Sequence, residues 1–182
     1  MTLKNISTKK IALIALCVGL NYVGGNIALF LRLPIYLDSL GTIMAAFLLG
    51  PIAGMAAGLL SGLLSGITTD LFSLYYIPVA LCTGFIAGIV YQRLHKTWRV
   101  PIEAAVISLP GTLISSFITY FLFGGITSSG SSIIVQLIHG LGLNQLTSVI
   151  LVQVITDYVD RLLSVVVVLS VIAILPKKVK MI

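Results

Sequence analysis

Long uncharged apolar runs are the feature that most constrains what this sequence can fold into. One run extends from Ile11 to Leu31, and a second uncharged stretch separates Asp38 from Asp70. A helix that crosses the hydrocarbon core of a bilayer needs about 20 such residues. Only 9% of the residues are charged, whereas a soluble domain carries about 25%. We therefore expect an integral membrane protein in contact with the lipid bilayer, which excludes a water-soluble enzyme, a nucleic-acid-binding protein and a disordered tail.

The apolar runs divide into six predicted membrane spans. The stretch between Asp38 and Asp70 is too long for one crossing at about 1.5 Å per residue, and Gly50 and Pro51 predict a tight turn within it. We therefore predict an all-α integral membrane protein, a compact bundle of six transmembrane helices in which residues 1–182 form a single membrane domain. The predicted spans are residues 11–31, 39–49, 52–69, 71–92, 101–123 and 145–175.

The basic residues predict how this bundle is oriented. Six crossings place both termini on one side of the membrane, and that side holds nine of the eleven Lys and Arg residues. Only Arg32 and Arg161 lie elsewhere. Because loops rich in Lys and Arg stay on the inner side, both termini are predicted to be cytoplasmic. The outer loops, among them residues 124–144, are longer than the inner turns, which favours a site that opens outward.

Small residues recur along two of the predicted spans. Glycine occupies every fourth position from 50 to 66, and Ala80, Gly84 and Gly88 repeat the pattern in the fourth span. In lipid, such rows let helix backbones approach closely. We interpret them as packing surfaces inside the subunit, with a sliding contact against a partner as the alternative.

The last predicted span is the most polar one. Gln153, Asp157, Asp160, Arg161 and Ser164 are spaced by three and four residues, which places them on one stripe of a helix. Ionisable groups inside a membrane are costly and mark candidate functional sites. The stripe is therefore a candidate binding surface, and the alternative is an Asp157–Arg161 salt bridge that only fixes the helix. The sequence leaves open whether Asp157, Asp160 and Arg161 contact a ligand or only each other.

Other polar residues lie toward the outer ends of the spans. Asn21 and Asn26 either hydrogen-bond an irregular backbone or line a polar cavity, and Arg32 and Asp38 are expected to fix the loop between them. The candidate substrate-binding residues are Asn21, Asn26, Arg32, Tyr36, Asp38, Tyr76, Asn144, Gln153, Asp157 and Arg161.

The sequence contains no enzyme motif. His95 and His139 have no metal-ligand spacing, and there is neither a nucleophile elbow nor a glycine-rich loop that could hold the phosphates of ATP. We therefore predict no catalytic residue, no metal site and no cofactor in this chain. If the protein takes part in pumped transport, a partner must use the ATP.

Four stretches carry a resemblance to a known family through their order and spacing. They are Gly-Leu-Asn-Tyr-Val-Gly-Gly at 19–25, Leu-Pro-Ile-Tyr-Leu-Asp-Ser-Leu-Gly-Thr at 33–42, Leu-Gly-Pro at 49–51 and Asp-Arg-Leu-Leu-Ser-Val at 160–165. With six short spans and both ends inside, they resemble the substrate-binding S component of an energy-coupling factor (ECF) transporter. The resemblance implies a multi-pass subunit of a bacterial cell membrane that binds a vitamin or related micronutrient in an outward pocket roofed by the loop after the first span.

The resemblance also implies partners: a transmembrane coupling subunit and two cytoplasmic ATPase subunits. Family members often dock to the coupling subunit through Ala-x-x-x-Ala on the first span, where this sequence has Ala12, Ala15 and Gly19. The competing interpretation is a self-sufficient small-solute carrier or channel. Such a protein should show inverted repeats of broken helices or a polar lining through the membrane. Polar residues here concentrate in the outer half, which favours a capture pocket.

Overall fold

The computed structural model describes residues 8–94 and 96–175 of the protein. Within these residues every regular element is a helix, which confirms the all-α prediction. The helices are α1 (Thr8–Phe30), α2 (Leu40–Leu49), α3 (Pro51–Thr68), α4 (Phe72–Tyr75), α5 (Ile77–Leu94), the 3-10 turn η1 (Thr97–Arg99), α6 (Val100–Phe121), α7 (Ser131–Gly140) and α8 (Gln145–Ile174).

Five of these helices coincide with predicted spans to within three residues: α1, α2, α3, α6 and α8. By length and composition, α1, α3 and α6 are long and apolar enough to cross a membrane. The fourth predicted span differs in detail, since Tyr76 separates the short helix α4 from α5. The number of crossings, their orientation and the single-domain organisation stay predictions.

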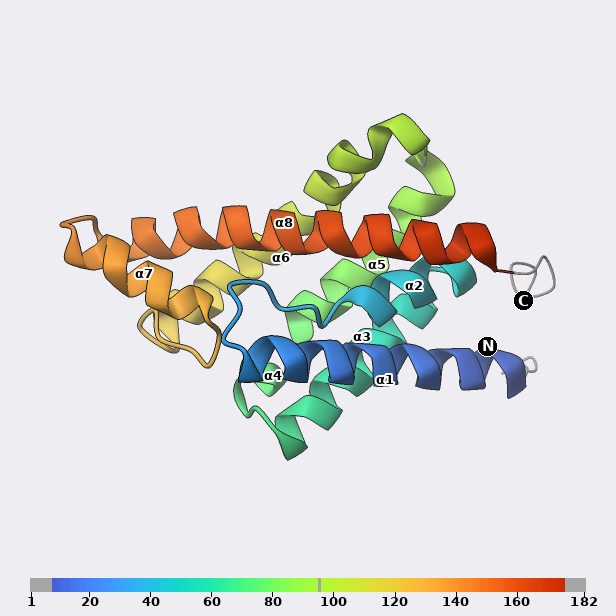
Figure 1. Cartoon of the computed structure of the whole chain (residues 1–182), viewed down its shortest axis with the longest axis horizontal. Coiled ribbons are helices and arrows are strands. Elements are labelled where there is room, and N and C mark those ends of the chain that lie inside the picture. The colour runs from blue at the N-terminus through green and yellow to red at the C-terminus, as the bar shows by residue number, and fades with distance from the viewer. Residues whose placement is uncertain (1–7, 95, 176–182) are drawn as a thin grey trace.

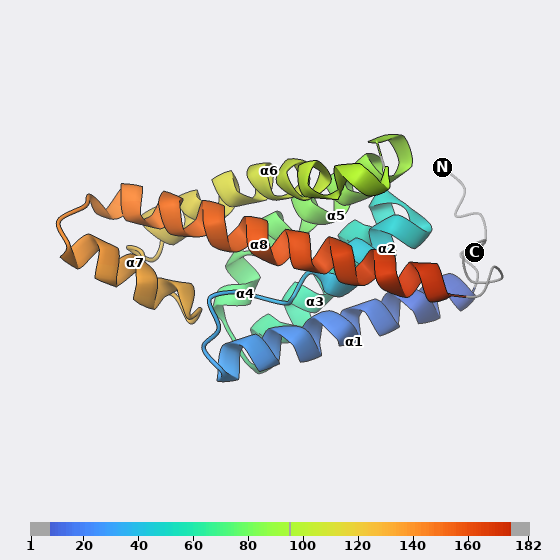
Figure 2. The same cartoon turned by 45° about the horizontal axis from the view of Figure 1, so that its top comes forward.

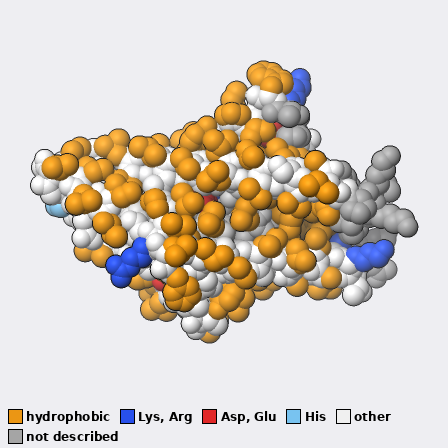
Figure 3. Space-filling model, in the orientation of Figure 1, with side chains coloured by type: hydrophobic (Ala, Val, Ile, Leu, Met, Phe, Trp, Pro, Cys, Tyr) orange, Lys and Arg blue, Asp and Glu red, His pale blue; other side chains and the backbone are white. Residues whose placement is uncertain are grey.

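The helices run roughly side by side along the long axis of the molecule (Figures 1 and 2). The first turn of α1 and the last turn of α8 lie at the same end. The face seen in Figure 3 is largely hydrophobic, with Lys and Arg side chains near its edges, as expected for a surface in lipid. Five residues of the sequence argument lie outside the described part of the chain: Lys4, His95, Lys177, Lys178 and Lys180.

Helix α2 forms the centre of the apolar half of the bundle. All of its residues from Gly41 to Phe47 are buried, and the ring of Phe47 stacks on Tyr91 of α5 with their centroids 4.2 Å apart. Buried apolar side chains from α1, α3, α5, α6 and α8 complete this cluster: Cys17, Ala57, Ala87, Val90, Ile107, Val165, Val168 and Ile172. The end of the bundle where α1 begins and α8 ends is therefore filled with hydrocarbon.

The glycine rows pack α3 against α5 inside the subunit. A Cβ atom at Gly84 would lie 2.4 Å from the carbonyl carbon of Gly54, and one at Gly58 would lie 2.9 Å from the backbone oxygen of Ala80. Only residues without side chains allow the two backbones to approach this closely. Gly50 has φ 97° and joins α2 to α3, which begins at Pro51. Both the predicted turn and the predicted internal packing agree with this geometry.

Helix α7 lies in the segment that we expected to be a loop. Val135 is buried against Val149 and Val152 of α8, with Ile134 and Ile138 beside it. These apolar residues recur at helical spacing, so one face of α7 packs on the first turns of α8. The prediction missed α7 because the segment is shorter than a membrane span and follows a Gly- and Ser-rich stretch.

Candidate functional site

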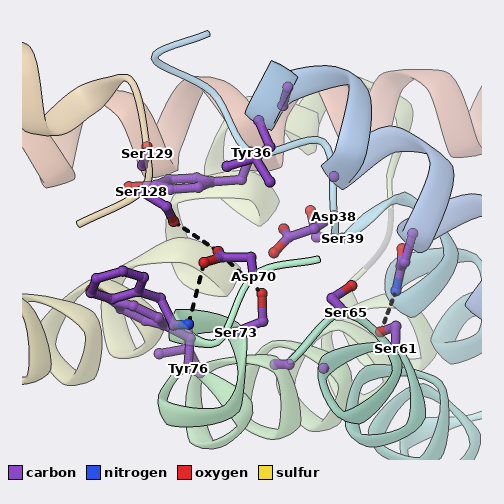
Figure 4. A pocket seen from close by; sticks show the side chains of 18 of the residues that line it. Tyr36, Asp38, Ser39, Ser61, Ser65, Asp70, Ser73, Tyr76, Ser128 and Ser129 are labelled. Atoms are coloured by element: carbon purple, nitrogen blue, oxygen red, sulfur yellow. Dashed lines mark hydrogen bonds between the residues drawn. The ribbon is translucent and has the colours of Figure 1, made fainter. Parts of the chain in front are cut away.

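A polar pocket lies in the half of the bundle away from the apolar cluster (Figure 4). Its walls come from every long helix except α7, from α4, and from three connecting segments, residues 31–39, 69–70 and 127–129. Seven of the ten predicted binding residues line it: Asn21, Asn26, Tyr36, Asp38, Tyr76, Asp157 and Arg161. Hydroxyl-bearing side chains supply much of the remaining polar wall: Ser39, Thr42, Ser61, Ser65, Thr69, Ser73, Thr83, Ser115, Thr127, Ser128 and Ser129.

Asn21 joins three helices at the end of the pocket that borders the apolar cluster. Its Oδ1 accepts hydrogen bonds from the backbone N–H groups of Gly41 (2.6 Å) and Thr42 (3.3 Å) at the start of α2. Its Nδ2 donates to Thr42 Oγ1 (2.8 Å) and to Ser61 Oγ of α3 (3.1 Å). The first N–H groups of a helix have no partner within the helix, so Asn21 caps α2 from a neighbouring helix. Both sequence interpretations of Asn21 therefore apply, because it binds backbone and also lines the cavity.

The loop of residues 31–39 is held in the pocket wall by Asp160 of α8. Asp160 Oδ1 accepts hydrogen bonds from the backbone N–H groups of Tyr36 (3.1 Å) and Leu37 (2.8 Å), and Ser39 Oγ donates to Asp160 Oδ2 (3.0 Å). Leu37 has φ 52°, and a Cβ atom at Gly24 would lie 2.2 Å from its backbone oxygen. The loop thus packs against the bare backbone of α1 on one side and against a buried carboxylate on the other.

Asp38 projects from this loop toward Asp70 and Ser65 (Figure 4). The side chain is exposed to the pocket, yet the surrounding protein solvates its charge poorly and raises its pKa to about 6. Arg161 opposes this rise in pKa, while Asp160 and Asp157 add to it. Asp38 therefore faces the cavity, and both its predicted substrate contact and its predicted loop-fixing role stay predictions.

Asp70 anchors the opposite wall of the pocket. Its Oδ2 accepts a hydrogen bond from Ser128 Oγ (2.8 Å), and Ser73 Oγ lies 3.4 Å from the same oxygen. The backbone N–H of Phe72 donates to Oδ1 (3.3 Å). Asp70 therefore ties the start of α4 to the segment that precedes α7.

Asp157 and Arg161 lie on the α8 side of the pocket. Arg161 Nη1 pairs with Asp160 Oδ2 at 2.6 Å, whereas Asp157 Oδ2 accepts from Thr112 Oγ1 (2.8 Å) and Ser115 Oγ (3.2 Å) of α6. The alternative Asp157–Arg161 salt bridge is thus replaced by a pair between adjacent residues. Hydroxyl groups of α6 thus hold Asp157 in place. Asp157 and Arg161 both line the cavity.

Three predicted binding residues lie away from the pocket wall. Gln153 Oε1 accepts from Ser116 Oγ (2.6 Å), and its Nε2 donates to Thr119 Oγ1 (2.6 Å), which places it in the contact between α6 and α8. Asn144 caps α8 by accepting from the N–H of Leu146. The side chain of Arg32 is exposed and is absent from the residues that line the cavity.

The predicted docking residues lie on one exposed side of α1. Ala12, Ala15 and Gly19 are all exposed, and a Cβ atom at Gly19 would meet nothing within 4 Å. Cys17, between them in sequence, is fully buried against the core. The small residues therefore form an open, shallow strip instead of an internal packing surface.

Sequence reasoning missed several wall residues, among them Asp70, Ser128 and Thr83. Asp70 had a signal, because it is one of only five acidic residues in the chain. Ser128 and Thr83 had none, since isolated hydroxyl side chains are ordinary in membrane helices and loops.

Comparison with known proteins gives one match. A family model described as "ECF transporter, substrate-specific component" matches residues 9–172 of the chain. Searches of curated proteins and of solved structures found no match. The family match covers every wall of the pocket described above.

Proposed function

The chain belongs to the family of ECF transporter substrate-specific components, which are membrane-embedded substrate-binding subunits and not enzymes, and we propose that it captures a vitamin or related small micronutrient from outside the cell. One observation carries this proposal: a helical, largely apolar bundle of this family holds a pocket in which polar side chains, three carboxylates and one guanidinium among them, are set between apolar ones. Pockets with a few well-placed polar groups are the usual form of small-molecule sites.

The closure of the pocket at its inner end favours capture over a channel. Asn21 and Thr42 line the inner end of the cavity, and the apolar cluster around Ile43 and Phe47 fills the bundle beyond it. Ions and polar solutes need a polar or water-filled route through hydrocarbon. A binding subunit that opens to one side needs only the pocket.

Transport then depends on partner subunits, as in other members of the family. We place the coupling subunit against the exposed strip of Ala12, Ala15 and Gly19, because small residues let a partner helix approach the α1 backbone closely. The sequence has no loop that could hold the phosphates of ATP. ATP hydrolysis is therefore assigned to two cytoplasmic ATPase subunits.

Binding and transport by the purified chain test this proposal. Native mass spectrometry and thermal melting of the detergent-solubilised protein should identify a water-soluble vitamin or nucleoside that binds. Proteoliposomes that contain only this chain should bind that compound without concentrating it, and the complete complex with ATP should accumulate it. Accumulation against a gradient by the isolated chain would show instead a self-sufficient carrier.

A further inference from the structure

We infer that the ligand of this pocket carries a positively charged nitrogen, held by the carboxylate of Asp38. This inference rests on the proposed function, because it names the class of molecule that the binding subunit captures. Charge, unpaired acceptor atoms and aromatic side chains in the pocket wall support it.

The charged groups of the wall are mainly acidic. Three carboxylates, those of Asp38, Asp70 and Asp157, line the cavity, and Arg161 is the only cationic side chain among its lining residues. Arg161 is already paired with the buried carboxylate of Asp160. The charge of Arg161 is therefore largely balanced by Asp160, which does not line the cavity. The three carboxylates of the wall leave it with an excess of negative charge. An anionic ligand would meet repulsion there, whereas a cation would be attracted.

Asp38 is the carboxylate most available to a ligand. Asp70 and Asp157 each accept hydrogen bonds from neutral hydroxyl groups. Across the described residues, by contrast, no hydrogen bond or ion pair joins the carboxylate of Asp38 to another side chain, and it is exposed to the cavity. A carboxylate that faces a pocket without a side-chain partner is suited to an ion pair or a charge-assisted hydrogen bond with the ligand.

Two further wall atoms need a hydrogen-bond partner. Thr83 is only 1% exposed, and its Oγ1 has no partner among the described residues. The Oδ1 atom of Asn26 is also buried without a partner, while its Nδ2 donates to Tyr22 O. Both residues line the cavity. An amide oxygen can only accept, so these atoms favour a ligand that brings N–H or O–H donors.

Aromatic side chains supply the remaining recognition for a cation. Tyr36, Phe72 and Tyr76 line the same cavity as Asp38. The faces of aromatic rings attract cations, including those of quaternary nitrogen. A metal ion fits less well, because the described residues contain no group of three or more His, Cys, Asp or Glu side chains placed to hold one.

A charge-sorted panel of compounds tests the inference on the full-length solubilised protein. The cationic probes are thiamine, pyridoxamine and choline, the neutral probes are pyridoxine, nicotinamide and uridine, and the anionic probes are biotin, pantothenate and nicotinate. We expect a cationic probe to raise the melting temperature most. Asp38→Asn should weaken the affinity for that probe about tenfold or more, since the attraction between the carboxylate and the positive charge of the ligand is lost, and Asp38→Glu should retain part of the affinity.

Glu103→Gln is the matched control, because it also removes one carboxylate but lies outside the lining of this pocket; it should leave the affinity near that of the wild type. Stabilisation only by neutral or anionic probes, or an unchanged affinity in Asp38→Asn, would overturn the inference and leave the proposed function in place. Stabilisation by no probe of any class would contradict the proposed function as well.

Discussion

Asp160 Oδ1 accepts a 2.8 Å hydrogen bond from the backbone N–H of Leu37, although 123 residues separate the two in sequence. Asp160 is fully buried, and Arg161 balances its charge. The loop that carries Tyr36 and Asp38 into the pocket is thereby fixed by the last helix of the chain. The position of the proposed ligand-binding carboxylate thus depends on a residue that does not itself line the cavity.

Asp160→Asn should therefore lower both stability and affinity. The variant leaves the buried Arg161 without its carboxylate, and breaking a buried pair costs about 3–5 kcal/mol. Thermal melting of the solubilised protein should show a clear decrease in melting temperature, and titration well below that temperature should show weaker binding. Asp38→Asn is the comparison, since it should weaken binding without this loss of stability. Equal melting of Asp160→Asn and the wild type would contradict the anchoring role.

Gln153→Ala should reduce stability but leave ligand affinity unchanged. The variant removes the acceptor of Ser116 and one of two partners of Thr119, which keeps its bond to Tyr76. A buried polar group left without a partner, as Ser116 would be, costs about 1–3 kcal/mol. Thermal melting and ligand titration measure the two effects separately. Val154→Ala, at a 41% exposed position of the same helix, is the control for truncation alone. Weakened binding with unchanged melting would return Gln153 to the pocket.

Gly84→Ala should destabilise the protein by forcing α3 away from α5. The added Cβ would lie 2.4 Å from the carbonyl carbon of Gly54, and such overpacking costs about 1–3 kcal/mol. Gly19→Ala makes the same chemical change where nothing lies within 4 Å, so it should be neutral or stabilise α1 by up to about 1 kcal/mol. The melting temperature should therefore fall clearly in Gly84→Ala and stay unchanged or rise slightly in Gly19→Ala.

Ala15→Trp should separate ligand binding from transport. A bulky side chain on the exposed strip of α1 would hold a partner helix away, yet it lies outside the pocket lining. We expect near wild-type affinity of the isolated chain and a steep loss of ATP-driven uptake by the assembled complex. Leu113→Trp, at a 73% exposed position of α6, controls for added bulk at the lipid surface. Unchanged uptake in Ala15→Trp would place the docking face elsewhere.

Acidification from pH 7 to pH 5 should have opposite effects on stability and on the binding of a cation. The pKa of Asp38 is raised from 3.8 to about 6 in the folded protein. Since the folded state binds this proton more tightly, the contribution of Asp38 to stability is present at low pH and is lost as the pH rises through about 6. The charged groups around it are Arg161, Asp160 and Asp157, with Asp70 across the cavity.

The melting temperature of the ligand-free protein should thus rise slightly on acidification, whereas affinity for a cationic ligand should fall as Asp38 becomes neutral. Asp38→Asn should flatten both dependences between pH 5 and pH 7. If both pH dependences persist unchanged in Asp38→Asn, a group other than Asp38 causes them.

Helix positions were predictable because the signals are local. Gly50 marks the α2–α3 turn because it tolerates the positive φ found there, and Pro51 marks it because proline favours the first position of a helix. Asn144 precedes α8 and caps it. The spacing of the small residues also predicted a close contact, which the approach of Gly84 to Gly54 supplies. Helix α7 was missed because its stability comes from burial of Val135 against α8, which composition does not reveal.

The pocket was only partly predictable because a helical stripe does not say which neighbour it faces. Gln153 and Asp157 share one side of α8 and both bind hydroxyl groups of α6, but only Asp157 also lines the cavity. The pairing of Arg161 with Asp160 instead of Asp157 likewise depends on where the loop of residues 31–39 enters. Which neighbour each polar side chain contacts depends on tertiary packing, and residue spacing alone does not predict it.

The short helix α2 has a consequence for how the protein is made. Its ten residues extend about 15 Å, about half of a bilayer's hydrocarbon core, so the predicted crossing needs the non-helical residues that precede it. Irregular backbone at membrane depth is tolerated only where protein or a water-filled cavity surrounds it. Asp160 of the last helix accepts hydrogen bonds from that backbone. The N–H groups of Tyr36 and Leu37 therefore find these partners only after the last helix has been synthesised and has entered the membrane. Biogenesis therefore ends with the step that completes the binding site.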